Sequence, residues 1–334
     1  MKEYNWVSLG CGVIANELAQ AMAAQGRHLY GVANRTHQKA VDFAQKYGVE
    51  RVYERIEDAF ADPKADTIYI STPHNTHIGY LRAALKSGKH VLCEKSITLN
   101  TGELEEAAAL AEKNGLVLAE AMTIYHMPLY KRLRELVQGG ALGPLRMIQM
   151  NFGSYKEYDM ENRFFNPRLA GGALLDIGVY ALSFVRWFLS QAPDRVLSQM
   201  KPAPSGVDEQ AGILLMDPAG EMATVALTLH AKQPKRGTIA CDKGYIEVYE
   251  YPRAEEAAII YTQDGRREVL REGRTGDALW YEILDMERAV AGEADEMHLD
   301  LTRDVMELMT RLRGEWGLRY PEEEPGYIGK EPLL

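Results

Sequence analysis

Cysteine is scarce in this sequence. The 334 residues include only three cysteines, Cys11, Cys93 and Cys241, which are widely separated. Three scattered cysteines are too few for a disulfide framework or for a zinc site built on cysteine. Such usage is typical of a reducing compartment, so we expect a cytoplasmic protein.

Basic charge and long apolar runs are also lacking. Lysine and arginine total 38 against 48 acidic residues, which gives a net charge of −10. Proteins that bind nucleic acid without sequence preference need a basic surface, so we expect no nucleic-acid partner. No apolar run looks long enough to cross a bilayer. The first residues, Met1 to Trp6, have neither the charged nor the apolar region of a signal peptide. We therefore expect no membrane association.

The composition is otherwise ordinary for a globular protein. Hydrophobic residues make up 46% and charged residues 26% of the chain. A length of 334 residues favours two domains over one. The acidic stretch from Pro321 to Pro325 is interpreted as a solvated terminus.

A glycine motif follows the first predicted strand, Tyr4 to Leu9. The motif has the form G-x-G-x-x-A and precedes a helical pattern that runs to Gln25; its residues are Gly10, Cys11, Gly12, Val13, Ile14 and Ala15. The first glycine permits a tight turn, and the second lets the backbone approach a pyrophosphate. The helix N-terminus would then bind the phosphates. The motif predicts a dinucleotide site, although a simple glycine-rich turn is the alternative.

The end of the second predicted strand bears on the choice of cofactor. This strand, His28 to Ala33, ends in Asn34, Arg35 and Thr36. An NAD site commonly has an acidic residue here that binds the ribose 2′-hydroxyl. No carboxylate is present, and an arginine can pair with phosphate and stack on adenine. We therefore expect NADP, with NAD as a second cofactor that the site could accept. In the alternative interpretation, Arg35 is an exposed residue at a helix start.

Strands and helices alternate up to Ala121, which predicts a doubly wound parallel sheet of the Rossmann type over residues 1–121. Residues just beyond the carboxyl ends of such strands face the ligand. Two predicted strands end in this way, at Ser71-Thr72-Pro73 and at Glu94-Lys95. His74 and His77 have i, i+3 spacing, but no cysteine or carboxylate accompanies them, so we expect no metal.

A helix in the second half of the chain carries a polar pair. A helical pattern runs from Pro167 to about Leu189, and it places Asp176 and Tyr180 at i and i+4, on one face. This face could line a polar site. Alternatively, Asp176 is favoured by the helix dipole and Tyr180 is half-buried. His126 and His230 are interpreted as structural or surface residues, with substrate contact as the alternative for each.

The remaining pattern predicts an α+β domain over residues 122–334. Seven short strands are expected between Arg195 and Leu270, separated by turns, and two helices follow. Consecutive short strands favour an open, mostly antiparallel sheet. The expected fold class is therefore α/β, with a Rossmann domain followed by an α+β domain.

The motifs together resemble those of the Gfo/Idh/MocA oxidoreductase family, over essentially the whole chain. In chain order they are Gly10-x-Gly12-x-x-Ala15, Ser71-Thr72-Pro73 with His77, Gly88 to Lys95, and Glu120-Ala121. Two positions depart from the family pattern. Ser96 stands where proline usually follows the lysine, and Tyr125 stands where many members have arginine.

The tyrosine at position 180 narrows the resemblance, because most members have histidine there. With tyrosine at this position, the sequence resembles the branch of the family that contains dimeric dihydrodiol dehydrogenase and glucose–fructose oxidoreductase. This resemblance implies that Lys95 and Tyr180 are the catalytic pair, with Asp176 orienting Lys95 or bonding a substrate hydroxyl. It also implies a homodimer formed through the sheet of the second domain. The expected cofactor-binding residues are Gly10, Gly12, Val13, Ile14, Asn34, Arg35, Thr36, Ser71, Thr72, Pro73, His77, Glu94 and Lys95.

The function expected from these residues is hydride transfer between NADP and a secondary alcohol or ketone of a sugar, polyol or cyclic diol. Tyr180 would be the general acid or base, and Lys95 would lower its pKa from the ordinary value of about 10. Two alternatives stay open. One is a non-catalytic NADP-binding regulator on the same fold. The other is a lyase or glycosidase that oxidises its substrate only transiently.

Overall fold

The computed structural model describes residues 3–324 and forms two compact units. Of the described residues, the first unit contains 3–121 and Gly276–Leu299, and the second contains Met122–Thr275 and 300–324. The division expected from the sequence, at 121/122, did not include the return of residues 276–299 to the first unit. The roles expected for the two domains stay predictions.

The first unit is built on a six-stranded parallel sheet. Its strand order is β3-β2-β1-β4-β5-β6. This is the doubly wound arrangement, in which the order reverses beside the first strand, and it confirms the predicted fold class. The strands are β1 (Trp6–Leu9), β2 (Gly31–Ala33), β3 (Arg51–Val52), β4 (Thr67–Ile70), β5 (His90–Glu94) and β6 (Leu118–Ala121).

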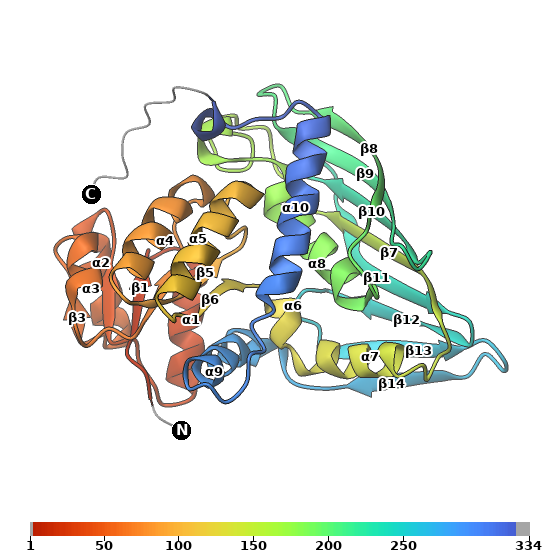
Figure 1. Cartoon of the computed structure of the whole chain (residues 1–334), viewed down its shortest axis with the longest axis horizontal. Helices are drawn as coiled ribbons and strands as arrows, with labels where there is room; N and C mark the ends of the chain where they lie inside the picture. Colours follow the sequence, from red (N-terminus) through yellow and green to blue (C-terminus); the bar gives the residue numbers. More distant parts are fainter. Residues whose placement is uncertain (1–2, 325–334) are drawn as a thin grey trace. The chain divides into compact units, whose positions relative to one another are not determined.

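Helices in the first unit form two groups. Helices α1 (Val13–Ala24), α2 (His37–Tyr47) and α9 (Ala278–Val290) pack together, as do α3 (Ile56–Ala61), α4 (His77–Lys86) and α5 (Thr101–Lys113). Figure 1 shows α4 and α5 side by side across the sheet. The core on the α1 side combines alternate strand residues with the apolar faces of α1 and α9; it includes Trp6, Tyr69, Leu92, Leu18, Met22, Ile283 and Met286. The short 3₁₀ turn His74–Thr76 precedes α4.

The second unit is built on an eight-stranded sheet in the order β14-β13-β12-β11-β7-β10-β9-β8. Among the described strand pairs of this sheet, only β7–β10 is parallel, so the sheet is mostly antiparallel as predicted. The strands are β7 (Leu145–Gly153), β8 (Arg195–Pro202), β9 (Asp208–Met216), β10 (Met222–Thr228), β11 (Gln233–Cys241), β12 (Gly244–Tyr249), β13 (Glu256–Tyr261) and β14 (Arg267–Arg271).

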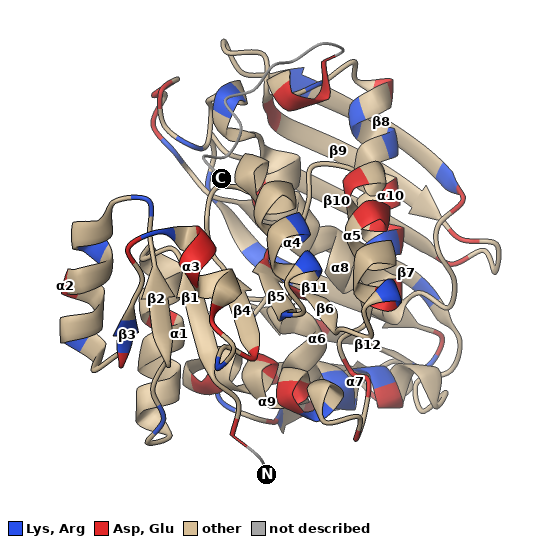
Figure 2. Ribbon diagram, turned by 60° about the vertical axis from the view of Figure 1, so that its left-hand side comes forward, with Lys and Arg blue, Asp and Glu red and all other residues tan. Residues whose placement is uncertain are grey.

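Helices α7 (Pro128–Gln138), α8 (Val179–Phe188) and α10 (Leu299–Glu315) also belong to this unit, together with the short helix α6 (Thr123–His126). Helix α8 packs on β7 and β10. The residue pattern from 125 to 138 is that of one helix, but the helix is broken at Met127, whose ψ of 129° is extended. The residue before a proline is disfavoured in the helical region, and Pro128 follows. In Figure 2, both signs of charge are interspersed along the helices of each unit.

The expectation that no apolar run is long enough to cross a bilayer was wrong. The segment Pro167–Phe188 is long and apolar enough to cross a bilayer by length and composition, with a mean hydropathy of 1.4. However, 78% of its apolar window is buried inside the protein, as in the core helix of a globular protein. The segment is therefore explained by packing.

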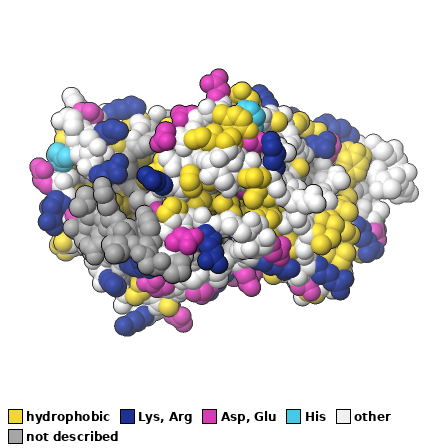
Figure 3. Space-filling view, turned by 90° about the horizontal axis from the view of Figure 1, so that it is seen from above, with side chains coloured by type: hydrophobic (Ala, Val, Ile, Leu, Met, Phe, Trp, Pro, Cys, Tyr) yellow, Lys and Arg dark blue, Asp and Glu magenta, His cyan; other side chains and the backbone are white. Residues whose placement is uncertain are grey.

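Large hydrophobic side chains are exposed at few positions. Figure 3 shows apolar side chains lying between charged ones on one face of the molecule. Among the described residues, the exposed large hydrophobics are Val13, Tyr155, Tyr158, Leu197, Tyr245 and Tyr249. Exposed apolar groups that gather at one place commonly mark a binding surface, and several of these recur below.

Candidate active site

Gly10 allows the turn after β1 to lie directly against the end of β4. Its φ is +106°, a conformation that strongly favours glycine. Its N–H donates to the Ala33 carbonyl at 2.9 Å. A Cβ at Gly10 would lie 2.8 Å from the Ser71 carbonyl oxygen and 2.8 Å from Ser71 Oγ. The first glycine of the motif is therefore required by backbone packing at the carboxyl edge of the sheet.

Gly12 differs, because a Cβ there would meet no atom within 4 Å. It is the N-cap of α1, which has no side-chain cap and no acidic residue in its first turn. The next side chain, Val13, is 80% exposed, and Ile14 is half-buried. Uncapped N–H groups at a helix start bind anions through hydrogen bonds and the helix dipole. This start of α1 fits a dinucleotide pyrophosphate, with space at Gly12 for its approach.

Substitution by alanine is expected to affect dinucleotide binding at Gly12 and protein stability at Gly10. Gly12→Ala is expected to leave the free energy of unfolding unchanged and to weaken dinucleotide binding by about 10-fold or more, because a methyl group would occupy the approach path. Gly10→Ala is expected to destabilise the protein by about 1–3 kcal/mol through strain at positive φ. Thermal unfolding without cofactor and calorimetric titration with dinucleotide measure the two effects. Equal loss of stability in both variants would contradict the assignment.

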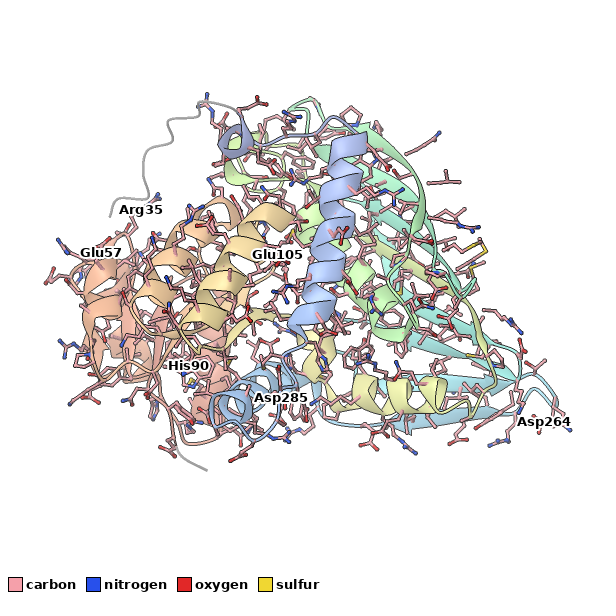
Figure 4. All side chains as sticks on the ribbon, in the orientation of Figure 1. Arg35, Glu57, His90, Glu105, Asp264 and Asp285 are labelled. Atoms are coloured by element: carbon pink, nitrogen blue, oxygen red, sulfur yellow. The ribbon has the colours of Figure 1, made fainter. Side chains whose placement is uncertain are left out.

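The end of β2 presents the residues expected at the adenosine end of the cofactor. Asn34 Nδ2 donates to the Thr36 carbonyl at 3.0 Å, and Arg35 and Thr36 are exposed. Burial raises the pKa of Tyr80, Glu57 raises it further and Arg35 lowers it, which places both charged groups near this tyrosine. Figure 4 shows Arg35 and Glu57 on the same flank of the first unit. Glu57 is an acid near this strand end that the sequence did not single out.

His77 joins the loops that follow β4 and β5. It is fully buried, with Nε2 2.8 Å from the Thr72 carbonyl oxygen and Nδ1 3.0 Å from that of Ser96. Burial lowers the pKa of His77. His74 Nε2 lies 3.0 Å from the Lys95 carbonyl oxygen. Both rings thus bond backbone oxygens and hold the segment around Lys95, whose peptide bond to Ser96 is cis.

Two buried carboxylates complete this edge of the first unit. Glu94 accepts a hydrogen bond from the Tyr69 hydroxyl, and Glu120 accepts one from the Ile97 N–H at 3.0 Å. Ser71 Oγ donates to the Leu9 carbonyl at 3.0 Å, and the Thr76 hydroxyl donates to the Pro73 carbonyl at 2.7 Å. The loops after β1, β4 and β5 are therefore tied to one another. Of the sequence-predicted residues, this edge contains Gly10, Gly12, Val13, Ile14, Ser71, Thr72, Pro73, His77, Glu94 and Lys95.

Asp176 and Tyr180 lie in the second unit, on a segment that is not one regular helix. Residues Leu174–Gly178 form a π-helix, and the Val179 N–H donates to the Leu174 carbonyl. The expectation of a continuous helix from Pro167 was wrong, because residues Pro167–Leu169 form a separate 3₁₀ turn and Ala170 has φ +53°. Single π-turns inside helices occur frequently at functional sites.

The surroundings of this pair are aromatic and basic. Asp176 Oδ1 lies 3.6 Å from a terminal nitrogen of Arg163, and the carboxylate is largely buried. The Tyr180 ring lies 6.3 Å from that of Phe152, between centroids. Arg163 was not singled out from the sequence. Its link to Asp176 depends on a loop conformation that no sequence spacing indicates.

The start of the π-helix rests on a buried carboxylate that the sequence analysis missed. Asp208 is fully buried at the start of β9, and its Oδ2 accepts a hydrogen bond from the Leu174 N–H at 2.6 Å. Burial raises the pKa of Asp208 to about 7, although the backbone N–H groups of Leu174, Asp208 and Ala173 and the charge of Arg313 oppose this. Gly172 has φ +128°, and a Cβ there would lie 2.1 Å from Asp208 Oδ1.

The C-terminal segment braces the same loop. The Tyr320 hydroxyl donates to the Gly171 carbonyl at 2.7 Å. Arg313 lies over the Tyr320 ring and bonds both oxygens of Glu323, at 2.7 and 2.9 Å. The stretch interpreted as a solvated terminus is therefore partly structural, since Glu323 is paired; Pro325 lies outside the described residues.

Tyr125, the residue that departs from the family's arginine, is a core residue. It is fully buried and stacks on Trp187 with centroids 5.2 Å apart and planes at 26°. Arg134 lies over the Trp187 ring at 4.2 Å. The roles expected for Lys95, Asp176 and Tyr180 in catalysis stay predictions.

The chain matches two family models. Residues 4–122 match the oxidoreductase family with NAD-binding Rossmann fold, and residues 130–247 match the GFO/IDH/MocA C-terminal domain. Among curated proteins, it is 31% identical to trans-1,2-dihydrobenzene-1,2-diol dehydrogenase of Xenopus tropicalis over 247 residues, which is 73% of this chain and 74% of that protein. The mouse (Mus musculus) protein of the same name is 29% identical over 249 residues, 73% of this chain and 74% of that protein.

Solved structures share the fold over nearly the whole chain. KijD10, a 3-ketoreductase from Actinomadura kijaniata in complex with NADP and TDP-benzene, superposes with a TM-score of 0.83 at 22% identity, over 94% of this chain and 98% of that one. UDP-N-acetylglucosamine 3-dehydrogenase from Acidithiobacillus ferrooxidans superposes with a TM-score of 0.80 at 22% identity, with the same coverage. At these identities the likeness concerns the fold.

Proposed function

Because the chain belongs to the Gfo/Idh/MocA oxidoreductase family, we propose that it is an NADP-dependent enzyme acting on a secondary alcohol or its ketone, in a sugar, polyol or cyclic diol. One observation carries the cofactor part of this proposal. The start of α1 is uncapped, a Cβ at Gly12 would have open space, and Val13 is exposed at the motif that binds pyrophosphate in such folds.

The bound nicotinamide would supply hydride chemistry, and the protein's own task is to position the substrate and move one proton. We assign proton transfer to the Tyr180 hydroxyl and stabilisation of its ionised form to Lys95. Asp176 would bind a substrate hydroxyl. In the second unit, Asp176 Oδ1 lies 3.6 Å from a terminal nitrogen of Arg163.

The preference for NADP is proposed from the end of β2. Asn34 uses its amide nitrogen to bond Thr36, and no carboxylate occupies the strand tip to repel a 2′-phosphate. The exposed Arg35 guanidinium can pair with that phosphate and stack on adenine. Glu57, which shares the neighbourhood of Tyr80 with Arg35, would act against the phosphate.

Substitutions on this strand end test the preference. Arg35→Ala is expected to weaken NADP binding by about 10–100-fold and to leave NAD binding nearly unchanged, because one charge-assisted contact to the 2′-phosphate is lost. Asn34→Asp should shift preference toward NAD. Glu57→Gln is the matched change of opposite sign and should tighten NADP binding. Calorimetry with both cofactors measures these constants; equal affinity of the wild-type protein for NAD and NADP would contradict the proposal.

The substrate class is supported by the named relatives. Curated relatives are named dehydrogenases of a cyclic diol, and two fold neighbours are named a 3-ketoreductase and a UDP-N-acetylglucosamine 3-dehydrogenase. A cofactor-coupled screen of sugars, polyols and cyclic diols tests the class. Stoichiometric change in NADPH absorbance supports a dehydrogenase. Product formation without net cofactor turnover would instead favour the lyase or glycosidase, and cofactor binding without turnover of any substrate would favour the regulator.

A homodimer through the second-unit sheet is also proposed. Leu197 is an exposed apolar residue on β8, the strand at one edge of the sheet. Strands β9 and β10 follow β8 in the sheet. A sheet face that exposes an apolar residue to water is suited to binding a second copy of the chain in a dimer. Sedimentation velocity measures the oligomeric state, and a monomer at micromolar concentration would contradict the dimer.

A further inference from the structure

Two exposed tyrosines in the second unit stack on one histidine. Tyr155 and Tyr158 are 54% and 44% exposed and lie in the loop that follows β7. The ring centroid of Tyr158 is 3.9 Å from that of His230, with planes at 21°. The Tyr155 centroid is 5.3 Å from that of His230, with planes at 27°. These three rings, Tyr155, Tyr158 and His230, are called the ring platform below.

The ring platform is held in place by buried polar groups. The Tyr158 hydroxyl donates to Glu209, whose side chain is 2% exposed and also accepts from Lys201 Nζ at 3.0 Å. His230 Nδ1 lies 3.0 Å from the Lys156 carbonyl oxygen, and so donates to it. The Lys156 N–H donates to the Leu229 carbonyl at 2.7 Å. Rings fixed in this way lose little conformational freedom on binding, as expected for a preorganised recognition surface.

The same loop continues to the helix segment that carries Asp176. Arg163 lies over the Phe164 ring at 4.7 Å, and Lys156 Nζ lies over the same ring at 4.4 Å. Arg163 in turn reaches Asp176 at 3.6 Å. The loop that carries Tyr155 and Tyr158 therefore also carries Arg163, which reaches the proposed substrate-binding carboxylate within the second unit.

The charges of the loop argue against a strongly anionic ligand. Between residues 154 and 168, the basic and acidic side chains balance: Lys156, Arg163 and Arg168 against Glu157, Asp159 and Glu161. A phosphate-binding surface needs an excess of cations. Exposed aromatic faces in a loop that carries both carboxylates and basic groups are instead suited to a neutral ring that carries hydroxyl groups.

We propose that Tyr155, Tyr158 and His230 bind a second ring of the substrate, a neutral glycosyl or aryl ring joined to the ring that bears the reacting hydroxyl. This inference deepens the proposed function and rests on it. It makes the substrate a two-ring compound, such as a disaccharide or an aryl glycoside, because a free monosaccharide would leave the ring platform uncovered. Apolar contact on the ring faces then contributes to KM and not to the proton transfer.

Calorimetry on the NADP-saturated protein tests the proposal without requiring turnover. The probes are glucose, a glucose disaccharide and phenyl glucoside. Wild-type protein is expected to bind one or both two-ring probes about 10-fold more tightly than glucose, and the better of the two identifies a glycosyl or an aryl ring. Tyr155→Ala should remove this advantage and leave the glucose constant unchanged. Tyr249→Ala, which removes an exposed tyrosine on β12, is the matched control and should change neither.

A second variant separates stacking from folding. Tyr158→Phe keeps the ring and loses the bond to Glu209, so it should retain the preference for two rings in weakened form. No preference for two-ring probes in the wild type, or equal losses for glucose and the two-ring probes in Tyr155→Ala, would overturn the ring platform. Uridine diphosphate bound more tightly than uridine would overturn the neutral ring. If two-ring probes bind but no substrate in the screen is oxidised or reduced, the proposed function fails while the ring platform stands.

Discussion

Lys95→Met and Tyr180→Phe are each expected to lower kcat by about 10²–10⁴-fold, the usual loss when a positioned proton-transfer group is removed. Tyr180→Phe removes one hydroxyl and keeps the ring that packs near Phe152. Lys95→Met keeps a long apolar chain and removes the charge at the loop that His74 and His77 hold. Steady-state kinetics with NADPH and the best substrate of the screen measures both.

The controls for these variants concern binding and folding. The unfolding temperature should stay close to wild type in both variants, because neither change alters the glycine turn. Cofactor affinity should stay close to wild type in Tyr180→Phe, whose position is not among the expected cofactor-binding residues. A pH–rate profile adds a test that a structural role would not pass: the basic limb of kcat should shift to higher pH in Lys95→Met, since the cation that favours ionised Tyr180 is gone. Turnover near the wild-type rate in either variant would refute its assignment.

Asp208→Asn is expected to change how the free energy of unfolding depends on pH. The pKa of Asp208 is about 7 in the folded protein against an ordinary value of 3.8. Between these values the folded state binds a proton that the unfolded state has released, so stability falls as pH rises and is constant above about pH 7. At about 1.4 kcal/mol for each pH unit below the folded pKa, the Asp208 contribution falls by about 3 kcal/mol between pH 5 and pH 8.

Urea unfolding of wild type and Asp208→Asn at several pH values isolates this contribution, because other groups titrate alike in both proteins. The difference in stability between the two should move by about 3 kcal/mol in favour of the Asp208→Asn variant as pH rises from 5 to 8. Asparagine can still accept the Leu174 hydrogen bond. A pH-independent difference would show that Asp208 does not titrate in this range. Asp217, another buried aspartate, provides a control substitution to Asn.

Local residue patterns predicted the scaffold of the first unit and its candidate cofactor site. The G-x-G-x-x-A motif lies between a strand and a helix that are neighbours in sequence, so turn geometry and helix start follow from adjacent residues. Short alternating runs and the turns between them likewise predicted the second sheet, because side-chain alternation is a property of each strand alone. The turn at Gly10 was predicted from the motif, whereas the close approach of Gly10 to Ser71 was not.

Features that depend on residues far apart in sequence were decided only by the tertiary structure. Helix α9 returns to the first unit, where Glu287 bonds the Trp6 indole at 2.9 Å and Arg27 at 2.7 Å across more than 250 residues. The π-turn under Asp176 depends on Asp208, and the exposed rings of the platform on Glu209 and His230. Hydrogen bonds and burial of this kind pair groups brought together by the fold, and the sequence carries no spacing that identifies the partners. The sequence by itself thus determined the elements and the chemistry at their ends, while long-range packing decided which side chains those elements hold in place.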